Sequence, residues 1–155
     1  MIEGEIRMAM TKNSAQAAHY TKEITIQASR ESVYRALTTK EGLAGWWSEQ
    51  VQRSEDRWQL YFQGPNHKID LAIHETIENE RLLWLCIEHS TFPEWANTCM
   101  VFQLIRQEDG VLVQFEHQGL MTHCACYTSC AQGWDFFLDS LKAYCETGSG
   151  TPWQG

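Results

Sequence analysis

The sequence lacks several features that would assign a function directly. It has no apolar run long enough to span a bilayer, and its first 20 residues lack the apolar core of a secretion signal. It also lacks the phosphate-binding patterns G-x-G-x-x-G and G-x4-G-K-[ST] and the zinc motif H-E-x-x-H. We therefore expect a cytoplasmic protein that uses no membrane, no cofactor and no resident metal.

Positive charge is also scarce. The 155 residues include 20 Asp and Glu against 12 Lys and Arg, which gives a net charge of −8. Because this field repels phosphate backbones, we expect no nucleic-acid partner. What the chain does have is 43% hydrophobic residues with seven Trp, enough for one domain with a substantial core. Residues 1–19 show no sustained hydrophobic period, so we expect a flexible N-terminal arm there and a folded domain over 20–153.

Hydrophobic periodicity predicts an ordered series of elements in that domain. Alternating residues over 20–28 indicate a strand, and two short helices follow it, the first beginning at Ser29. Several strands come next, of which 82–89 is apolar on both faces, as a central strand would be. Apolar residues then repeat at helical spacing over 125–146, and Gly148 lies beyond the end. This long helix needs an apolar partner, and a sheet is the only large one available.

Short motifs within this order are similar to those of one superfamily. The ending carries Gly133–Trp134 and the run from Phe137 to Gly148, and "GWW" follows the second short helix. With "FEHQGL" at 115–120, the chain resembles the START-like (SRPBCC) helix-grip superfamily over 21–153, and within it the branch of activators of the heat-shock chaperone ATPase. The resemblance implies an α+β fold in which a strongly bent antiparallel sheet wraps around the long helix. It also implies a cavity between them, which in relatives takes lipids, polyketides, sterols or hormones.

The segment "HCACYTSCAQGW" at 123–134 has two interpretations. Cys and His are preferred zinc ligands, but zinc sites usually contain two separated pairs. A helix that starts near residue 124 would also place Cys124 and Cys126 about 200° apart around its axis. We therefore expect Cys126 and Cys130 on the inward face of the helix as small apolar groups, with His123 and Cys124 in the preceding loop at the cavity mouth. A sensor of soft metal ions or oxidants is the alternative.

Catalysis in the cavity would need titratable groups inside it. Glu75 shares its alternation with Ile73 and Ile77, so we expect it to face the concave side of the sheet, where burial would raise its pKa. A rim carboxylate paired with an arginine is the alternative. A nucleophilic pair would combine Cys130 with His74 or His117, a contact that sequence cannot show.

We predict that the protein binds an apolar, lipid- or polyketide-like small molecule between the sheet and the last helix, and we assign no catalytic residue. Two other classes stay open: a cochaperone-like activator with a chaperone partner, and a cyclase or hydrolase that uses the same cavity. A homodimer also remains open. The residues expected to contact the ligand are Trp47, Trp58, Leu60, Ile73, Glu75, Trp84, Cys126, Cys130, Trp134, Phe137 and Leu141.

Overall fold

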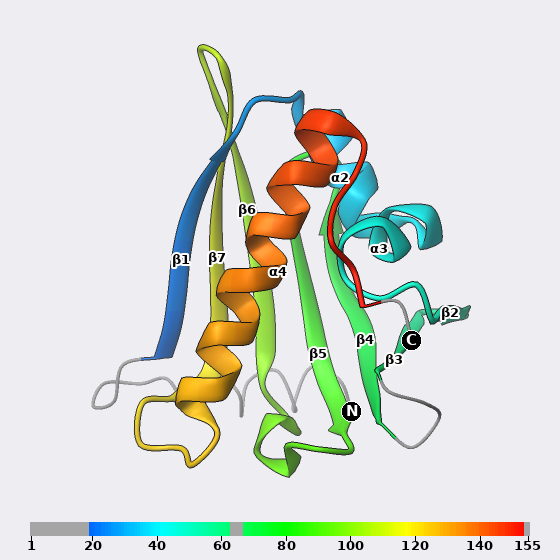
Figure 1. Cartoon of the computed structure of the whole chain (residues 1–155), viewed down its shortest axis with the longest axis vertical. Helices are drawn as coiled ribbons and strands as arrows, with labels where there is room; N and C mark the ends of the chain where they lie inside the picture. Colours follow the sequence, from blue (N-terminus) through cyan, green and yellow to red (C-terminus); the bar gives the residue numbers. More distant parts are fainter. Residues whose placement is uncertain (1–18, 63–66, 154–155) are drawn as a thin grey trace.

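Seven strands form one antiparallel sheet in the computed structural model, which describes residues 19–62 and 67–153. The strand order is β1-β7-β6-β5-β4-β3-β2, so β5 is central as predicted, and β1 pairs with β7 rather than with its neighbour in sequence (Figure 1). The predicted N-terminal arm lies outside the described residues except for His19. The strands are β1 (His19–Ile26), β2 (Val51–Ser54), β3 (Arg57–Tyr61), β4 (Lys68–Ile77), β5 (Arg81–His89), β6 (Cys99–Gln107) and β7 (Gly110–Met121).

The helices begin and end where side chains or backbone conformation provide caps. The side chain of Ser29 accepts a hydrogen bond from the Ser32 amide at the start of α2 (Arg30–Thr38), and Thr39 caps the start of α3 (Lys40–Trp46) in the same way. The long helix α4 (Tyr127–Thr147) ends at Gly148, whose φ of 86° is left-handed. No helix in the described ranges is long and apolar enough to cross a membrane.

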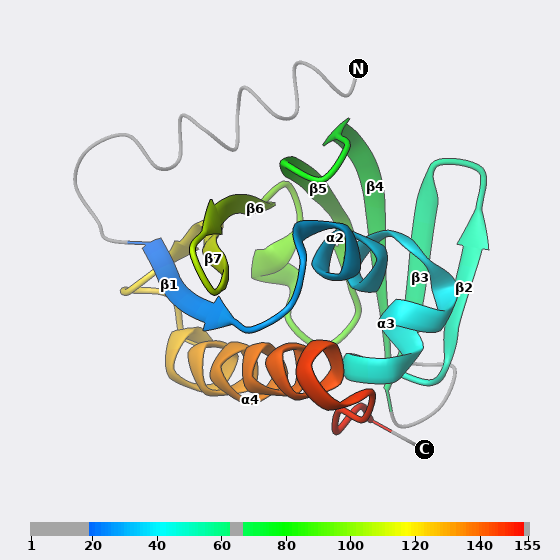
Figure 2. The same ribbon diagram turned by 90° about the horizontal axis from the view of Figure 1, so that it is seen from above.

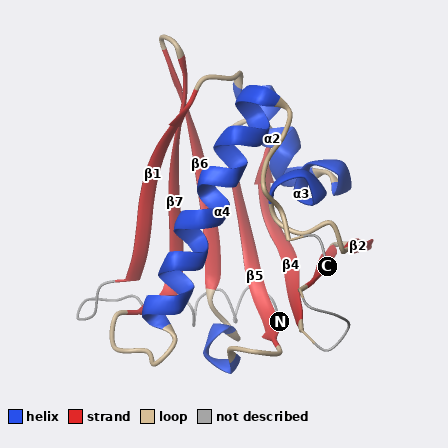
Figure 3. Cartoon of the chain, in the orientation of Figure 1, coloured by secondary structure: helices blue, strands red, loops and turns tan. Residues whose placement is uncertain are grey.

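The helices all lie on the concave side of the sheet. Figure 2 shows α4 lying along the open side of the bent sheet, with α2 and α3 at one end of it. Figure 3 shows the same separation of one strand layer from the helices. A short 3-10 helix, η1 (Pro93–Trp95), lies in the connection between β5 and β6. This arrangement confirms the predicted helix-grip fold. The long helix begins two residues later than predicted, and its first helical hydrogen bond runs from the Cys130 amide to the Cys126 carbonyl at 2.8 Å.

Glu75 does not face the concave side, so that prediction is wrong. Ile73 pairs with Trp84 but Glu75 pairs with Leu83, which leaves His74 as an extra residue in a β-bulge. One inserted residue reverses the alternation of the strand. Glu75 therefore shares the convex face with Leu83, where its carboxylate accepts a hydrogen bond of 2.9 Å from Arg81 Nε. The alternative of a carboxylate paired with an arginine is confirmed.

Candidate ligand-binding cavity

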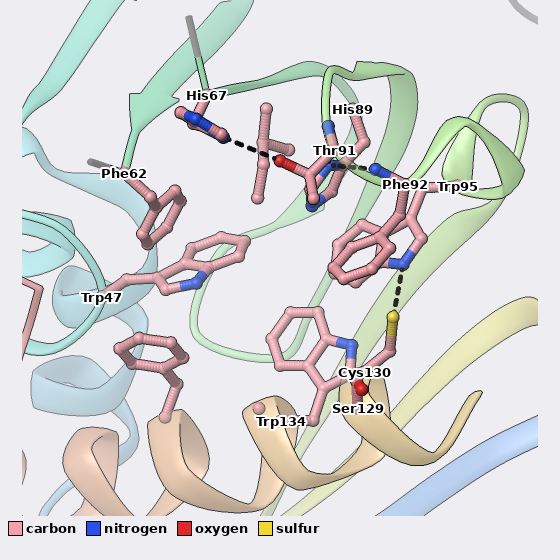
Figure 4. A pocket seen from close by; sticks show the side chains of 13 residues that line it. Trp47, Phe62, His67, His89, Thr91, Phe92, Trp95, Ser129, Cys130 and Trp134 are labelled. Carbon is pink, nitrogen blue, oxygen red and sulfur yellow. Dashed lines mark hydrogen bonds between the residues drawn. The ribbon is translucent and has the colours of Figure 1, made fainter. Parts of the chain in front are cut away.

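A cavity of about 270 Å³ lies between the N-terminal half of α4 and one end of the sheet, and it is partly open to solvent. Its walls come from the end of α3, the adjoining ends of β3, β4 and β5, the loop with η1, and one face of α4 (Figure 4). Six of the thirteen residues are Phe or Trp, so the surface is mainly apolar. The lining residues are Trp47, Phe62, His67, Ile69, His89, Thr91, Phe92, Trp95, Ser129, Cys130, Gly133, Trp134 and Phe137.

The aromatic rings of the wall pack against one another. Trp95 and Trp134 are stacked, with ring centroids 5.8 Å apart and planes 10° apart. Trp47 is tilted against Trp134 at 5.3 Å, and Phe62 contacts both Trp47 and Phe137 at 6.4 and 6.1 Å. Rings held edge to face or offset gain about 0.5–1.5 kcal/mol per pair beyond the burial of their area. The wall is therefore built as one aromatic unit rather than from separate side chains.

Hydrogen bonds behind the wall hold its two stacked indoles in place. Trp134 Nε1 donates to His117 Nδ1 at 2.9 Å, and because an indole N–H can only donate, this nitrogen of His117 is an acceptor. The proton of the neutral ring is then on Nε2, which lies 2.7 Å from Thr98 Oγ1, and Thr98 in turn donates to the Trp95 carbonyl at 2.6 Å. Trp95 Nε1 donates to Cys130 Sγ at 3.1 Å. Both indole N–H groups thus have partners, and the rings are oriented before any ligand arrives.

His89 is held by the loop that follows it. Its Nδ1 accepts hydrogen bonds from two backbone amides, Thr91 N at 3.1 Å and Phe92 N at 3.0 Å. Its ring lies against Trp95 and Phe92, with centroids 4.6 and 5.0 Å away. Burial lowers the pKa of His89 to about 4 from the ordinary 6.5, with the charge of Glu94 acting in the opposite direction. The ring is therefore neutral near pH 7.

Polar side chains occupy the outer edge of the cavity. His67 Nδ1 and Thr91 Oγ1 are 3.0 Å apart, and this hydrogen bond joins the start of β4 to the loop after β5 (Figure 4). Ser90 ties the same two segments together, since its hydroxyl accepts from Lys68 N at 2.5 Å and donates to Lys68 O at 3.1 Å. The arrangement is an apolar interior with a polar edge, which is the usual form of small-molecule sites.

The cysteine-rich segment forms the loop before α4 and the start of that helix, and of its His and Cys residues only Cys130 is among the described residues that line the cavity. His123 is exposed and Cys124 half-buried in the loop before α4, while Cys126 and Cys130 are buried. Burial raises the pKa of Cys126 to about 12 and also raises that of Cys130, so their thiolates are scarce at neutral pH. Among the described residues, no group of three or more His, Cys, Asp or Glu is arranged to hold a metal ion.

The cavity wall includes four of the eleven residues expected to contact a ligand, namely Trp47, Cys130, Trp134 and Phe137. Six others lie elsewhere in or against the core, and Glu75 lies on the convex face. Sequence reasoning missed the loop after β5, although two large aromatics beside a proline in "TFPEWAN" were a signal of a packed loop. The six core residues are Trp58, Leu60, Ile73, Trp84, Cys126 and Leu141. The missed wall residues are Phe62, His67, Ile69, His89, Thr91, Phe92, Trp95, Ser129 and Gly133.

The fold and the position of the cavity define a helix-grip protein of the START-like class. The family described as "Activator of Hsp90 ATPase homolog 1-like protein" matches residues 27–146, and the chain belongs to this family. This confirms the resemblance on which the fold prediction depended. A search of curated proteins gave no match.

Solved structures support the same fold. The Aha1 dimer from Colwellia psychrerythraea, determined in solution, is 29% identical with a TM-score of 0.75, covering 86% of this chain and 99% of that chain. A protein from Staphylococcus saprophyticus is 17% identical with a TM-score of 0.70, covering 86% and 96%. DynU16, from the dynemicin biosynthetic locus, is 16% identical with a TM-score of 0.63, covering 84% of this chain and 48% of that one. The last two show a common fold only.

Proposed function

We propose that the protein binds a compact, largely aromatic small molecule in the cavity between α4 and the sheet. The observation that carries this proposal is the wall of packed aromatic rings around an open space of about 270 Å³. Small-molecule sites are typically about 300–1,000 Å³ in volume and mostly apolar, with a few placed polar groups. The cavity volume lies just below this range, which favours a ligand of a few fused rings over a long acyl chain.

The chemistry of the wall favours binding over catalysis. Among the described lining residues there is no carboxylate, and Glu75, the best acid–base candidate in the sequence, lies on the other face of the sheet. The thiol of Cys130 has a raised pKa and accepts its hydrogen bond from Trp95, which cannot act as a base. A nucleophile needs a base within hydrogen-bonding reach, so a cyclase or hydrolase has little support here.

The binding proposal is tested with N-phenyl-1-naphthylamine, an apolar dye that fluoresces when it leaves water. We expect saturable binding to the wild type and weaker binding to Gly133→Leu, because Gly133 lines the cavity and a Cβ placed there meets no atom within 4 Å. Gln132→Leu is the matched control, since it adds the same side chain at the exposed neighbouring position. Non-saturable binding, or equal losses in the two variants, would contradict the proposal. As a separate measurement, native mass spectrometry of the purified protein would identify a ligand carried through purification.

An activator role is the second candidate, and family membership supports it. It predicts that the purified protein accelerates ATP hydrolysis by an Hsp90-type chaperone from the same source. Because the Colwellia relative is described as a dimer, we also propose a homodimer for this chain, which sedimentation analysis would test. Neither proposal requires the cavity to be occupied, so both are independent of the dye experiment.

A further inference from the structure

We propose that His89 selects the ligand by donating a hydrogen bond from Nε2, so that the cavity prefers planar aromatic molecules that carry a neutral acceptor such as a ketone or quinone carbonyl. This inference rests on the proposed binding function and names the chemical class of its ligand. Three features support it: the tautomer of His89, the direction of its free edge, and the charge of the site.

The tautomer of His89 follows from the hydrogen bonds that two backbone amides donate to its ring. Thr91 N and Phe92 N both donate to Nδ1, and a backbone amide has no lone pair with which to accept. Nδ1 must therefore carry the lone pair, and the single proton of the neutral imidazole is on Nε2. The loop thus holds the ring as a donor at Nε2, independent of any ligand.

The donor lies at the end of the ring away from the loop backbone. His89 lines the cavity, and Figure 4 shows its imidazole projecting from the end of β5 toward the space bordered by Trp47, Trp95 and Trp134. Within the described chain, both hydrogen bonds found for the His89 ring are at Nδ1. A donor at the edge of an apolar site strengthens binding of a ligand whose acceptor pairs with it. The aromatic rings that border the cavity beside it suit a flat ligand.

The charge of the site favours a neutral acceptor over an ionised one. Burial keeps His89 neutral near pH 7, so the ring offers a hydrogen bond but no positive charge to pair with a carboxylate. Moving a carboxylate into an aromatic cavity costs desolvation free energy, and a hydrogen bond from a neutral donor does not offset this cost. The net charge of −8 opposes an anion further. A ligand with an ammonium group is also disfavoured, because that group would face the N–H proton of His89 Nε2 instead of a hydrogen-bond acceptor.

Two probes of nearly equal shape test the proposal. 2-Acetylnaphthalene carries a carbonyl oxygen, and 2-ethylnaphthalene lacks it. Dissociation constants are measured by quenching of tryptophan fluorescence for the wild type, for His89→Asn and for His89→Phe. Asn retains a side-chain oxygen that accepts from the loop amides but has no donor at the position of Nε2, and Phe retains the ring but removes both nitrogens. Thermal melts of each variant show that it is folded.

We expect His89→Asn to weaken binding of the ketone by roughly 3- to 10-fold, the equivalent of one neutral hydrogen bond, and to leave the hydrocarbon within about 2-fold. His89→Phe should lose the ketone preference as well. Equal losses of both probes, or no change for either, would overturn the role of His89 while leaving the binding proposal intact. If neither probe binds to the folded wild type, the proposed function itself is wrong. Long-range 1H–15N spectra provide an independent readout, since they must show the proton on Nε2 and a shift on addition of the ketone.

Discussion

The two halves of α4 pack against the same sheet in different ways. In the C-terminal half, Leu138 and Leu141 are fully buried and Ser140 Oγ donates to the Trp46 carbonyl at 2.8 Å and accepts from the Thr151 amide at 2.7 Å. In the N-terminal half, the inward positions border an open cavity, and Gly133 meets no atom within 4 Å of where a Cβ would be. The inward positions Leu138 and Leu141 are thus filled by core packing, whereas the inward positions of the other half leave space beside the aromatic rings.

The adjacent tryptophans at the end of α3 show the same difference within two residues. Trp46 is fully buried, and its Nε1 donates to the Ala36 carbonyl at 2.8 Å, which fastens α3 to α2. Trp47 stacks on Trp46 with centroids 5.2 Å apart and on Trp84 at 5.8 Å, and it also lines the cavity. The contacts that stabilise the fold are thus concentrated at the C-terminal end of α4. The cavity at the other end is bordered by rings that aromatic neighbours and hydrogen bonds hold in place.

The largest difference should appear when one large side chain is removed from each half. Leu141→Ala should lower the free energy of unfolding by about 2–5 kcal/mol, because it leaves a void in a filled core. Phe137→Ala should cost less, about 1–2 kcal/mol, because Phe137 is half-buried, but it should weaken binding of the apolar dye. Urea unfolding and dye titration of both variants provide the measurements. A loss of dye affinity in folded Leu141→Ala equal to that in Phe137→Ala would mean that the cavity extends into the C-terminal half.

Acid should destabilise the cavity end through His89. The pKa of His89 is about 4 in the folded protein and near 6.5 when unfolded, so between these values the unfolded chain binds the extra proton. The free energy of unfolding should therefore fall as pH drops from 6.5 toward 4, by on the order of 2–3 kcal/mol. Glu94 and His67 are the titratable neighbours that modify this titration. Urea unfolding at several pH values should show a flatter profile for His89→Asn, and an unchanged profile would contradict the assignment.

The close contact between α2 and α3 should be destabilised by even one added carbon atom. A Cβ on Gly42 would lie 2.6 Å from both the Cα and the carbonyl oxygen of Ala36, which are backbone atoms of α2 that cannot turn aside. Gly42→Ala should therefore lower the free energy of unfolding by about 1–3 kcal/mol, despite the better helix propensity of Ala. Thermal and urea unfolding test this. No loss of stability would indicate that α2 and α3 can separate, and that the two ends differ less than their packing suggests.

Local patterns made the fold predictable. Helical spacing from Cys126 to Tyr144 identifies α4 and its inward face, and alternation identifies most strands, because both periods depend only on neighbouring residues. The prediction for Glu75 is wrong for a different local reason. The extra residue His74 reverses the alternation of β4, and nothing in the sequence of that strand indicates a bulge.

The cavity wall was less predictable because the position of a residue along its helix or strand matters as well as the face on which it lies. Leu60 and Leu141 are on inward faces, as expected, but they lie where the core is filled. Trp95 reaches the wall from the loop after β5, and the same loop holds the His89 ring at the end of that strand; loop positions are set by tertiary contacts. Periodicity therefore identifies the side of a helix or strand that is buried, and it does not identify which part of that side is open.

The smallest expected effect is also the most direct test of the open half. Gly133 lies in the middle of α4, and a methyl group added there would have no atom within 4 Å, so Gly133→Ala should gain the full helix propensity of Ala without a clash. We expect the free energy of unfolding to rise by about 0.5–1 kcal/mol, opposite in sign to Gly42→Ala although both substitutions add the same methyl group within a helix. Differential scanning calorimetry of the two variants beside the wild type would measure both signs. A loss of stability in Gly133→Ala would mean that this position is closed in solution. The contrast between the two halves of α4, and the cavity with it, would then have to be abandoned.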